Sequence, residues 1–122
     1  MEKYRSKVTA IGPEALSLLE ANMLIIFNNN APAELAEITV MHTIDTLKEK
    51  VEKGDIVTLG GHDYEVLFVG SEANSTLGEL GHCTFYLYGE GVEYRELPGY
   101  IILKCNEKPV IEIGQTIAIN RK

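Results

Sequence analysis

Short apolar segments alternate with glycines and polar clusters along the whole chain. They recur at intervals of roughly 8 to 15 residues, which is typical of successive strands in an antiparallel sandwich or barrel. Several are rich in Val, Ile, Thr, Tyr and Phe, side chains that suit a pleated, half-buried surface. The predicted strands are Tyr4–Ile11, Met23–Phe27, Glu37–Thr43, Asp55–Leu59, Tyr64–Gly70, His82–Tyr88, Tyr100–Cys105 and Gln115–Asn120. The pattern therefore predicts a mainly β fold, a small antiparallel β-barrel or sandwich.

One hairpin is marked directly in the sequence. Gly60-Gly61-His62-Asp63 separates the strand that ends at Leu59 from the strand that begins at Tyr64. Because glycine adopts positive φ without a steric penalty, this segment is suited to a tight turn between antiparallel strands.

Helical periodicity is confined to three short segments. Pro13–Ala21 has apolar residues at helical spacing behind a proline that suits a first turn. Asp45–Glu52 places Leu47 and Val51 four residues apart, with Gly54 able to end the helix. Ser71–Leu80 has Leu77 and Leu80 three residues apart before Gly81. We therefore expect one to three short helices.

Length and charge narrow the class of protein. A chain of 122 residues suits one domain, which we expect to span residues 1–122. The formal net charge is -7 and no Lys/Arg cluster is present, so we expect no nucleic-acid partner. No apolar run approaches the roughly 20 residues of a membrane-spanning helix. We therefore expect a cytoplasmic protein that does not insert into the membrane. Edge strands of two copies could pair, so the sequence leaves open whether the protein forms a homodimer.

The two cysteines each lie inside an apolar run. Cys83 opens Cys-Thr-Phe-Tyr-Leu and Cys105 closes Ile-Ile-Leu-Lys-Cys. Small thiols pack well in such places, so free buried cysteines are favoured over a disulfide.

Candidate chemistry rests on three histidines, because no nucleotide-binding or serine-hydrolase motif is present and no cofactor is predicted. His42 shares a strand face with Ile38, Val40 and Ile44, whereas Thr39 and Thr43 face away. One interpretation is a core-edge histidine with a ring nitrogen bonded to a backbone carbonyl. The other is a nucleophile exposed in a shallow apolar depression and aimed by a rigid strand. The residues alone leave both open.

The other histidines carry weaker signals. His82 follows Gly81 at a strand start, a position typical of the mouth of a sheet. His62 lies in the predicted turn, where imidazole is usually solvated. A metal site built from the three histidines lacks the close ligand spacing of known motifs. Glu34 and Glu37 are near enough in sequence to orient a ring nitrogen of His42, although parity places Glu37 on the opposite face.

These segments together resemble a known family, the IIA component of the glucitol/sorbitol-specific phosphotransferase system. The matching pieces are Met23–Phe27, Ala31-Pro32, Leu35, the strand ending in His42, Gly54, Leu59-Gly60, Tyr64, Val66, Val69-Gly70, Ala73-Asn74, Leu77, Leu80-Gly81-His82, Thr84, Gly89, Pro98-Gly99, Gly114 and Ile117. Their order and spacing are specific as a set.

The resemblance implies a phosphotransferase component that carries a phosphoryl group on a histidine. HPr would be the donor, and the IIB domain of the membrane permease would be the acceptor. His42 matches the phosphorylated histidine of the family, and His82 matches a motif histidine for which we expect a supporting role. The alternative from the residues alone is a non-catalytic β-barrel module that binds a ligand or a protein.

Overall fold

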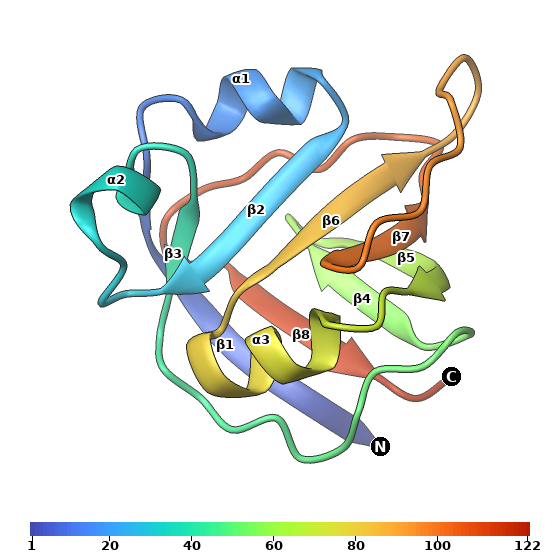
Figure 1. Ribbon diagram of the computed structural model, residues 1–122, viewed down its shortest axis with the longest axis horizontal. Coiled ribbons are helices and arrows are strands. Elements are labelled where there is room, and N and C mark those ends of the chain that lie inside the picture. Colours follow the sequence, from blue (N-terminus) through green and yellow to red (C-terminus); the bar gives the residue numbers. More distant parts are fainter.

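The computed structural model describes residues 1–122 and shows eight strands and three short helices (Figure 1). The strands are β1 (Glu2–Ile11), β2 (Met23–Asn28), β3 (Val40–His42), β4 (Ile56–Leu59), β5 (His62–Val69), β6 (Cys83–Tyr88), β7 (Tyr100–Lys104) and β8 (Thr116–Asn120). The helices are α1 (Ala15–Glu20), α2 (Ala33–Ala36) and α3 (Ala73–Leu80). The predicted class, a mainly β barrel with short helices, is confirmed.

The strands form one closed barrel in the order β1-β3-β2-β6-β7-β5-β4-β8. Six neighbouring pairs are antiparallel, but β2–β3 and β6–β7 are parallel. Residues 29–39 and 89–99 make the crossover connections that parallel neighbours require. A closed barrel has no free edge strand, so a homodimer cannot form by the edge-strand pairing considered from the sequence.

The predicted hairpin is present, with a shorter turn than expected. Leu59 pairs with His62, so Gly60-Gly61 alone forms the turn and His62 begins β5. Both glycines have positive φ, 57° and 81°, as a two-residue turn matched to the strand twist requires.

Side chains that alternate inward along the strands fill the barrel. This inner core contains 23 buried residues from all parts of the chain, among them Leu24, Ile26, Val40 and Phe85. Cys83 and Cys105 are both buried and free, as predicted. A smaller cluster of Tyr86, Tyr100 and Ile102 packs on the outer wall of β6 and β7.

The prediction of a helix over Asp45–Glu52 is wrong, because this segment is irregular. Its polar backbone groups bind distant parts of the chain. Lys48 N–H donates to Lys3 O at 2.8 Å, and the Lys3 ammonium donates to Lys50 O at 3.0 Å. The Asn74 amide bonds both Val51 N and Val51 O, at 2.7 and 3.0 Å. These partners replace the i to i−4 bonds that a helix would need.

A buried ion pair anchors the same segment to the barrel. Lys3 Nζ lies 2.7 Å from Asp55 Oδ2, and their side chains are only 0% and 5% exposed. Asp55 also accepts a hydrogen bond from Glu52 N at 2.8 Å. The long connection from β3 to β4 is thereby held against β1.

Candidate functional site

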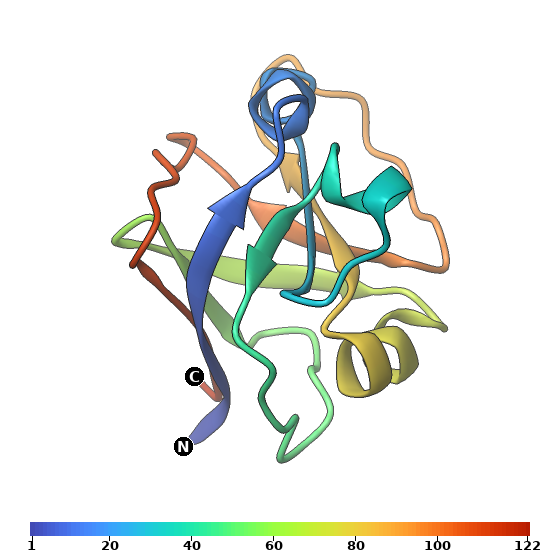
Figure 2. The same cartoon turned by 90° about the vertical axis from the view of Figure 1, so that its left-hand side faces the viewer.

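His42 lies at the end of β3, the shortest strand, between β1 and β2. It pairs with Val8 of β1 and with Asn28 of β2. Figure 2 shows β3 running toward the end of the barrel where α3 lies. The His42 side chain is 0% exposed, so it belongs to the barrel interior. The predicted exposure of this ring in a surface depression is therefore wrong for this conformation, because barrel closure buries the face that His42 shares with Val40.

Both ring nitrogens of His42 face backbone carbonyl oxygens. Nδ1 is 3.0 Å from Thr43 O and Nε2 is 2.7 Å from Gly81 O. The ring of Tyr4 packs edge-on against it, with ring centroids 6.0 Å apart. Because a neutral imidazole has one N–H, it can donate to only one of the two carbonyls. This is the ring-to-carbonyl bonding that the structural interpretation predicted.

Burial determines the charge of this ring. It lowers the pKa of His42 below its ordinary value of 6.5, while the carbonyl bonds of Gly81 and Thr43 and the charge of Asp45 act in the opposite direction. His42 is consequently neutral at pH 7, and one of its nitrogens holds a lone pair.

Gly81 is the residue that closes the site over His42. It caps α3 with φ of +62°, a left-handed conformation that glycine adopts readily. A Cβ at this position would lie 1.9 Å from Asn28 Oδ1 and 2.9 Å from His42 Cε1. A side chain there would force Asn28 to move and would strain the backbone, so glycine suits the close approach of this carbonyl to His42.

Asn28 is a buried polar residue of the site that the sequence reasoning missed. Its Oδ1 is buried without a hydrogen-bond partner, and the residue is 6% exposed. The only signal available in the sequence was its place in Asn28-Asn29-Asn30, directly after an apolar strand. Its parallel pairing with His42 could not be read from that pattern.

His82 lies beside Gly81 on the outer side of the barrel wall. Its Nδ1 is 3.0 Å from Ile26 O, and its ring packs on Phe27 with centroids 5.0 Å apart. The residue is half-buried and Nε2 has no hydrogen-bond partner. The structure thus brings His42 and His82 to the two sides of Gly81, which neither spacing nor parity predicts.

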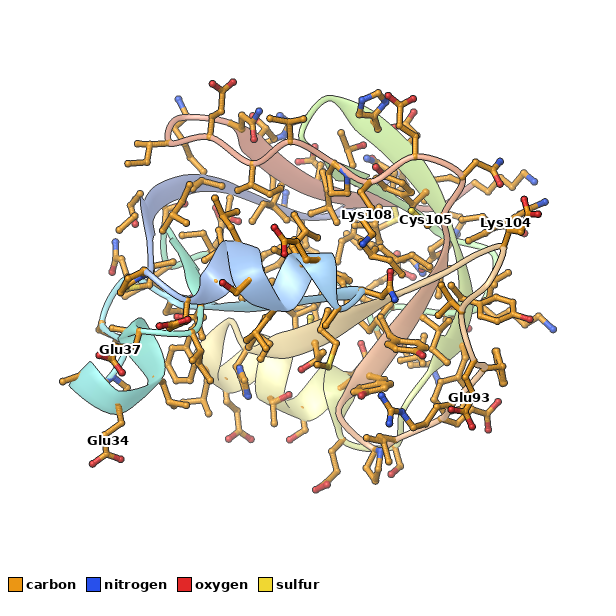
Figure 3. The ribbon with its side chains drawn as sticks, turned by 90° about the horizontal axis from the view of Figure 1, so that it is seen from above. Glu34, Glu37, Glu93, Lys104, Cys105 and Lys108 are labelled. Carbon is orange, nitrogen blue, oxygen red and sulfur yellow. The ribbon has the colours of Figure 1, made fainter.

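The remaining candidates lie elsewhere or act differently. His62 is exposed at the start of β5, with its ring near Tyr64. Glu34 and Glu37 are exposed, and Glu34 projects away from the body of the molecule (Figure 3). Both ring nitrogens of His42 face backbone carbonyls, so neither carboxylate orients the ring. Thr43 contributes its backbone carbonyl, since its hydroxyl accepts Lys7 N–H at 3.0 Å.

The site is not a ligand pocket. None of the four surface clefts is lined by His42 or His82. No group of three or more His, Cys, Asp or Glu side chains is arranged to hold a metal ion. No helix is both long and apolar enough to span a membrane. What the site offers is imidazole chemistry at one end of the barrel.

Comparison with known proteins defines the class. A solved structure of a phosphotransferase-system IIA component from Enterococcus faecalis V583 superposes with a TM-score of 0.81 at 28% identity, covering 93% of this chain and 97% of that one. The barrel is thus the fold of a IIA component, a phosphotransferase component that carries phosphoryl groups.

The family is defined by sequence. The model of the glucitol/sorbitol-specific IIA component of the phosphotransferase system matches residues 3–118. Glucitol/sorbitol-specific EIIA components of Escherichia coli (strain K12) and Shigella flexneri are each 40% identical over 98 residues, which is 80% of this chain and 78% of theirs. The chain belongs to the glucitol/sorbitol-specific IIA family, as its resemblance implied.

Proposed function

We propose that the chain accepts a phosphoryl group from phospho-HPr on Nε2 of His42 and passes it to the IIB domain of a glucitol/sorbitol permease. Residues 1–122 act in this proposal as one IIA-type domain in the cytoplasm. The observation that carries it is the position of His42, an imidazole whose two nitrogens face backbone carbonyls at one end of the barrel in a family-matching segment.

The two nitrogens of His42 are not equivalent. Nδ1 faces the carbonyl of Thr43, whose N–H is fixed to Lys7 O at 2.9 Å in the pairing with β1. Nε2 faces the carbonyl of Gly81, at the junction between α3 and β6. A glycine at a helix end moves more readily than a residue in a strand ladder. Displacement of the Gly81 carbonyl therefore leaves Nε2 without a partner, and the tautomer with its proton on Nδ1, donating to Thr43 O, then carries the lone pair on Nε2.

The transfer itself needs positioning more than acid or base. The Nε2 lone pair attacks phosphorus, and the donor N–P bond breaks with its electron pair returning to the donor imidazole. Asn28 lies beside the reacting ring with its buried Oδ1 unpartnered, and rotation of this amide would turn its Nδ2 donors toward the phosphoryl group. Burial then protects phosphohistidine from water until the acceptor docks.

Exposed apolar side chains flank both histidine segments. Ile44, two residues after His42, is 59% exposed, and Leu80, two residues before His82, is 43% exposed. Such residues suit a modest, transient protein interface. We propose that HPr and IIB dock here in turn.

A second candidate function is a non-catalytic binding module. It is favoured by the full burial of His42 and by the carbonyl partner of each of its nitrogens, an arrangement that also suits a purely structural ring. The two functions differ in one reactivity, since only a carrier forms an acid-labile, base-stable phosphohistidine.

The test is a reconstituted relay of phosphoenolpyruvate, enzyme I, HPr, this protein and IIB. Wild type and His62→Asn, the exposed-histidine control, should each gain one phosphoryl mass and then phosphorylate IIB. His42→Asn should not phosphorylate IIB. Absence of any adduct on folded wild type with active donors favours the binding module, and transfer to IIB by His42→Asn contradicts the assignment of the residue.

A further inference from the structure

The tautomer of His82 follows from its partner. Nδ1 lies 3.0 Å from Ile26 O, and a carbonyl oxygen can only accept. Nδ1 is therefore the protonated nitrogen of the neutral ring, and Nε2 carries the lone pair. A hydrogen bond from one nitrogen to a backbone carbonyl is how proteins set the nucleophilic nitrogen of an imidazole.

Nε2 of His82 is not fully buried. It has no hydrogen-bond partner, and the buried polar atoms without partners are Tyr4 Oη, Ser6 Oγ, Asn28 Oδ1 and Thr39 Oγ1. The ring is nevertheless held in place by Phe27 at 5.0 Å and by the bond to Ile26. Its backbone is also fixed, because His82 N–H donates to Thr76 O at the end of α3. This imidazole is therefore held in place, with one nitrogen that has no partner and is not fully buried.

The two histidines therefore differ in whether a hydrogen-bond partner covers Nε2. Nε2 of His42 is covered by the Gly81 carbonyl at 2.7 Å, whereas Nε2 of His82 is free in the same conformation. Only one residue separates the covering carbonyl from the free ring. An incoming phosphoryl group at this end of the barrel therefore has no hydrogen-bond partner to displace from Nε2 of His82.

We propose that Nε2 of His82 is a second phosphoryl-accepting atom of the site and the one that phospho-HPr reaches first, an inference that rests on the proposed function. The Nε2 lone pair forms the new N–P bond, and the donor N–P bond breaks with its electron pair returning to the HPr imidazole. Nδ1–H of His82 stays bonded to Ile26 O, so no proton leaves this ring. His82 thus acts as more than the supporting group that the family motif suggested.

The surroundings make phospho-His82 short-lived. Neither a hydrogen bond nor an ion pair joins His82 to a lysine or arginine. The ring also lies at the C-terminal end of α3, where the helix dipole disfavours added negative charge. A group bound there is poorly stabilised, which favours its onward transfer. Once the Gly81 carbonyl has moved, the Nε2 lone pair of His42 forms the new N–P bond, and the N–P bond to His82 breaks with its electron pair returning to Nε2 of His82.

The experiment compares His42→Asn, His82→Asn, the double variant and His62→Asn in the reaction with phospho-HPr. His42→Asn should still gain one acid-labile phosphoryl group, mapped to His82 by electron-transfer fragmentation. The double variant should gain none, and His62→Asn should behave as wild type. His82→Asn should acquire its group on His42 at least about tenfold more slowly than wild type.

A second measurement uses wild type alone and therefore tests the proposal even if His42→Asn does not fold. Rapid quenching of wild type should show phosphate on His82 before it accumulates on His42. If folded His42→Asn gains no group, or if wild type never has phosphate on His82, the second acceptor is refuted while the carrier function stands. If wild type gains no group at all from active phospho-HPr, the carrier function and this inference both fail.

Discussion

Substitution of Gly81 by alanine tests how tightly the site is closed. The new Cβ would lie 1.9 Å from Asn28 Oδ1 and 2.6 Å from Asn28 Cγ, in a backbone with φ of +62°. The left-handed backbone costs a non-glycine residue about 1–2 kcal/mol. The overlap with buried neighbours adds about 1–3 kcal/mol. We therefore expect Gly81→Ala to lower the free energy of unfolding by about 2–5 kcal/mol.

Gly61→Ala is the matched control. Gly61 has φ of +81°, but a Cβ there meets nothing within 4 Å. It should cost only the backbone contribution, about 1–2 kcal/mol. Urea denaturation of both variants, followed by circular dichroism, gives the difference, which isolates the packing against Asn28 and His42.

A double-mutant cycle locates the cause. Asn28→Ala removes both atoms nearest the new Cβ, so Gly81→Ala should be less destabilising by about 1 kcal/mol or more in that background. Equal losses for Gly81→Ala and Gly61→Ala, or no coupling between Gly81 and Asn28, would refute the close packing on which the covered His42 depends.

Four further predictions concern charge and the reacting ring. Lys3→Met leaves Asp55 buried without its cation and should cost about 3–5 kcal/mol in urea denaturation, whereas Arg5→Met, which breaks an exposed pair with Glu2, should cost less than about 1 kcal/mol. Because burial lowers the pKa of His42 below 6.5, the unfolded chain binds the proton more tightly than the folded protein does. The free energy of unfolding should therefore be highest above pH 6.5 and fall at lower pH, by at most about 1.4 kcal/mol per pH unit. His42→Asn should lose this dependence in urea denaturation. Asn28→Asp removes the amide donors and adds negative charge, so stopped-flow phosphorylation by phospho-HPr should slow about tenfold, an effect that an unchanged rate would contradict. With a net charge of -7, the protein should also be phosphorylated more slowly as NaCl is raised, and a flat salt series argues against electrostatic attraction of the donor.

Local pattern accounts for the strands and the hairpin. Alternation along segments such as Met23–Phe27 requires one face to be buried, whatever the neighbouring strands are. Gly60-Gly61 allows the positive φ values of a two-residue turn without help from the rest of the chain. These features depend on residues close in sequence. The hairpin was predicted, although its turn has two residues rather than the four expected.

Errors arose where distant residues supply the partners. Asp45–Glu52 has helical spacing, but Lys3 and Asn74 bind its backbone groups and hold it in an irregular conformation. The parallel pairs β2–β3 and β6–β7 were also not predicted, since alternation does not show the direction of the neighbouring strand. In both cases the deciding bonds join segments that the pattern treats separately.

The site divides in the same way. The sequence by itself determined that His42 lies on an apolar strand face and that His82 follows a glycine at a strand start, because both properties are local. Only the tertiary structure decided that His42 is buried and that Gly81, 39 residues further along, covers its Nε2. Barrel closure turns that strand face inward and brings the end of α3 against β3, and hydrogen-bond geometry then leaves Nε2 of His82 as the free nitrogen.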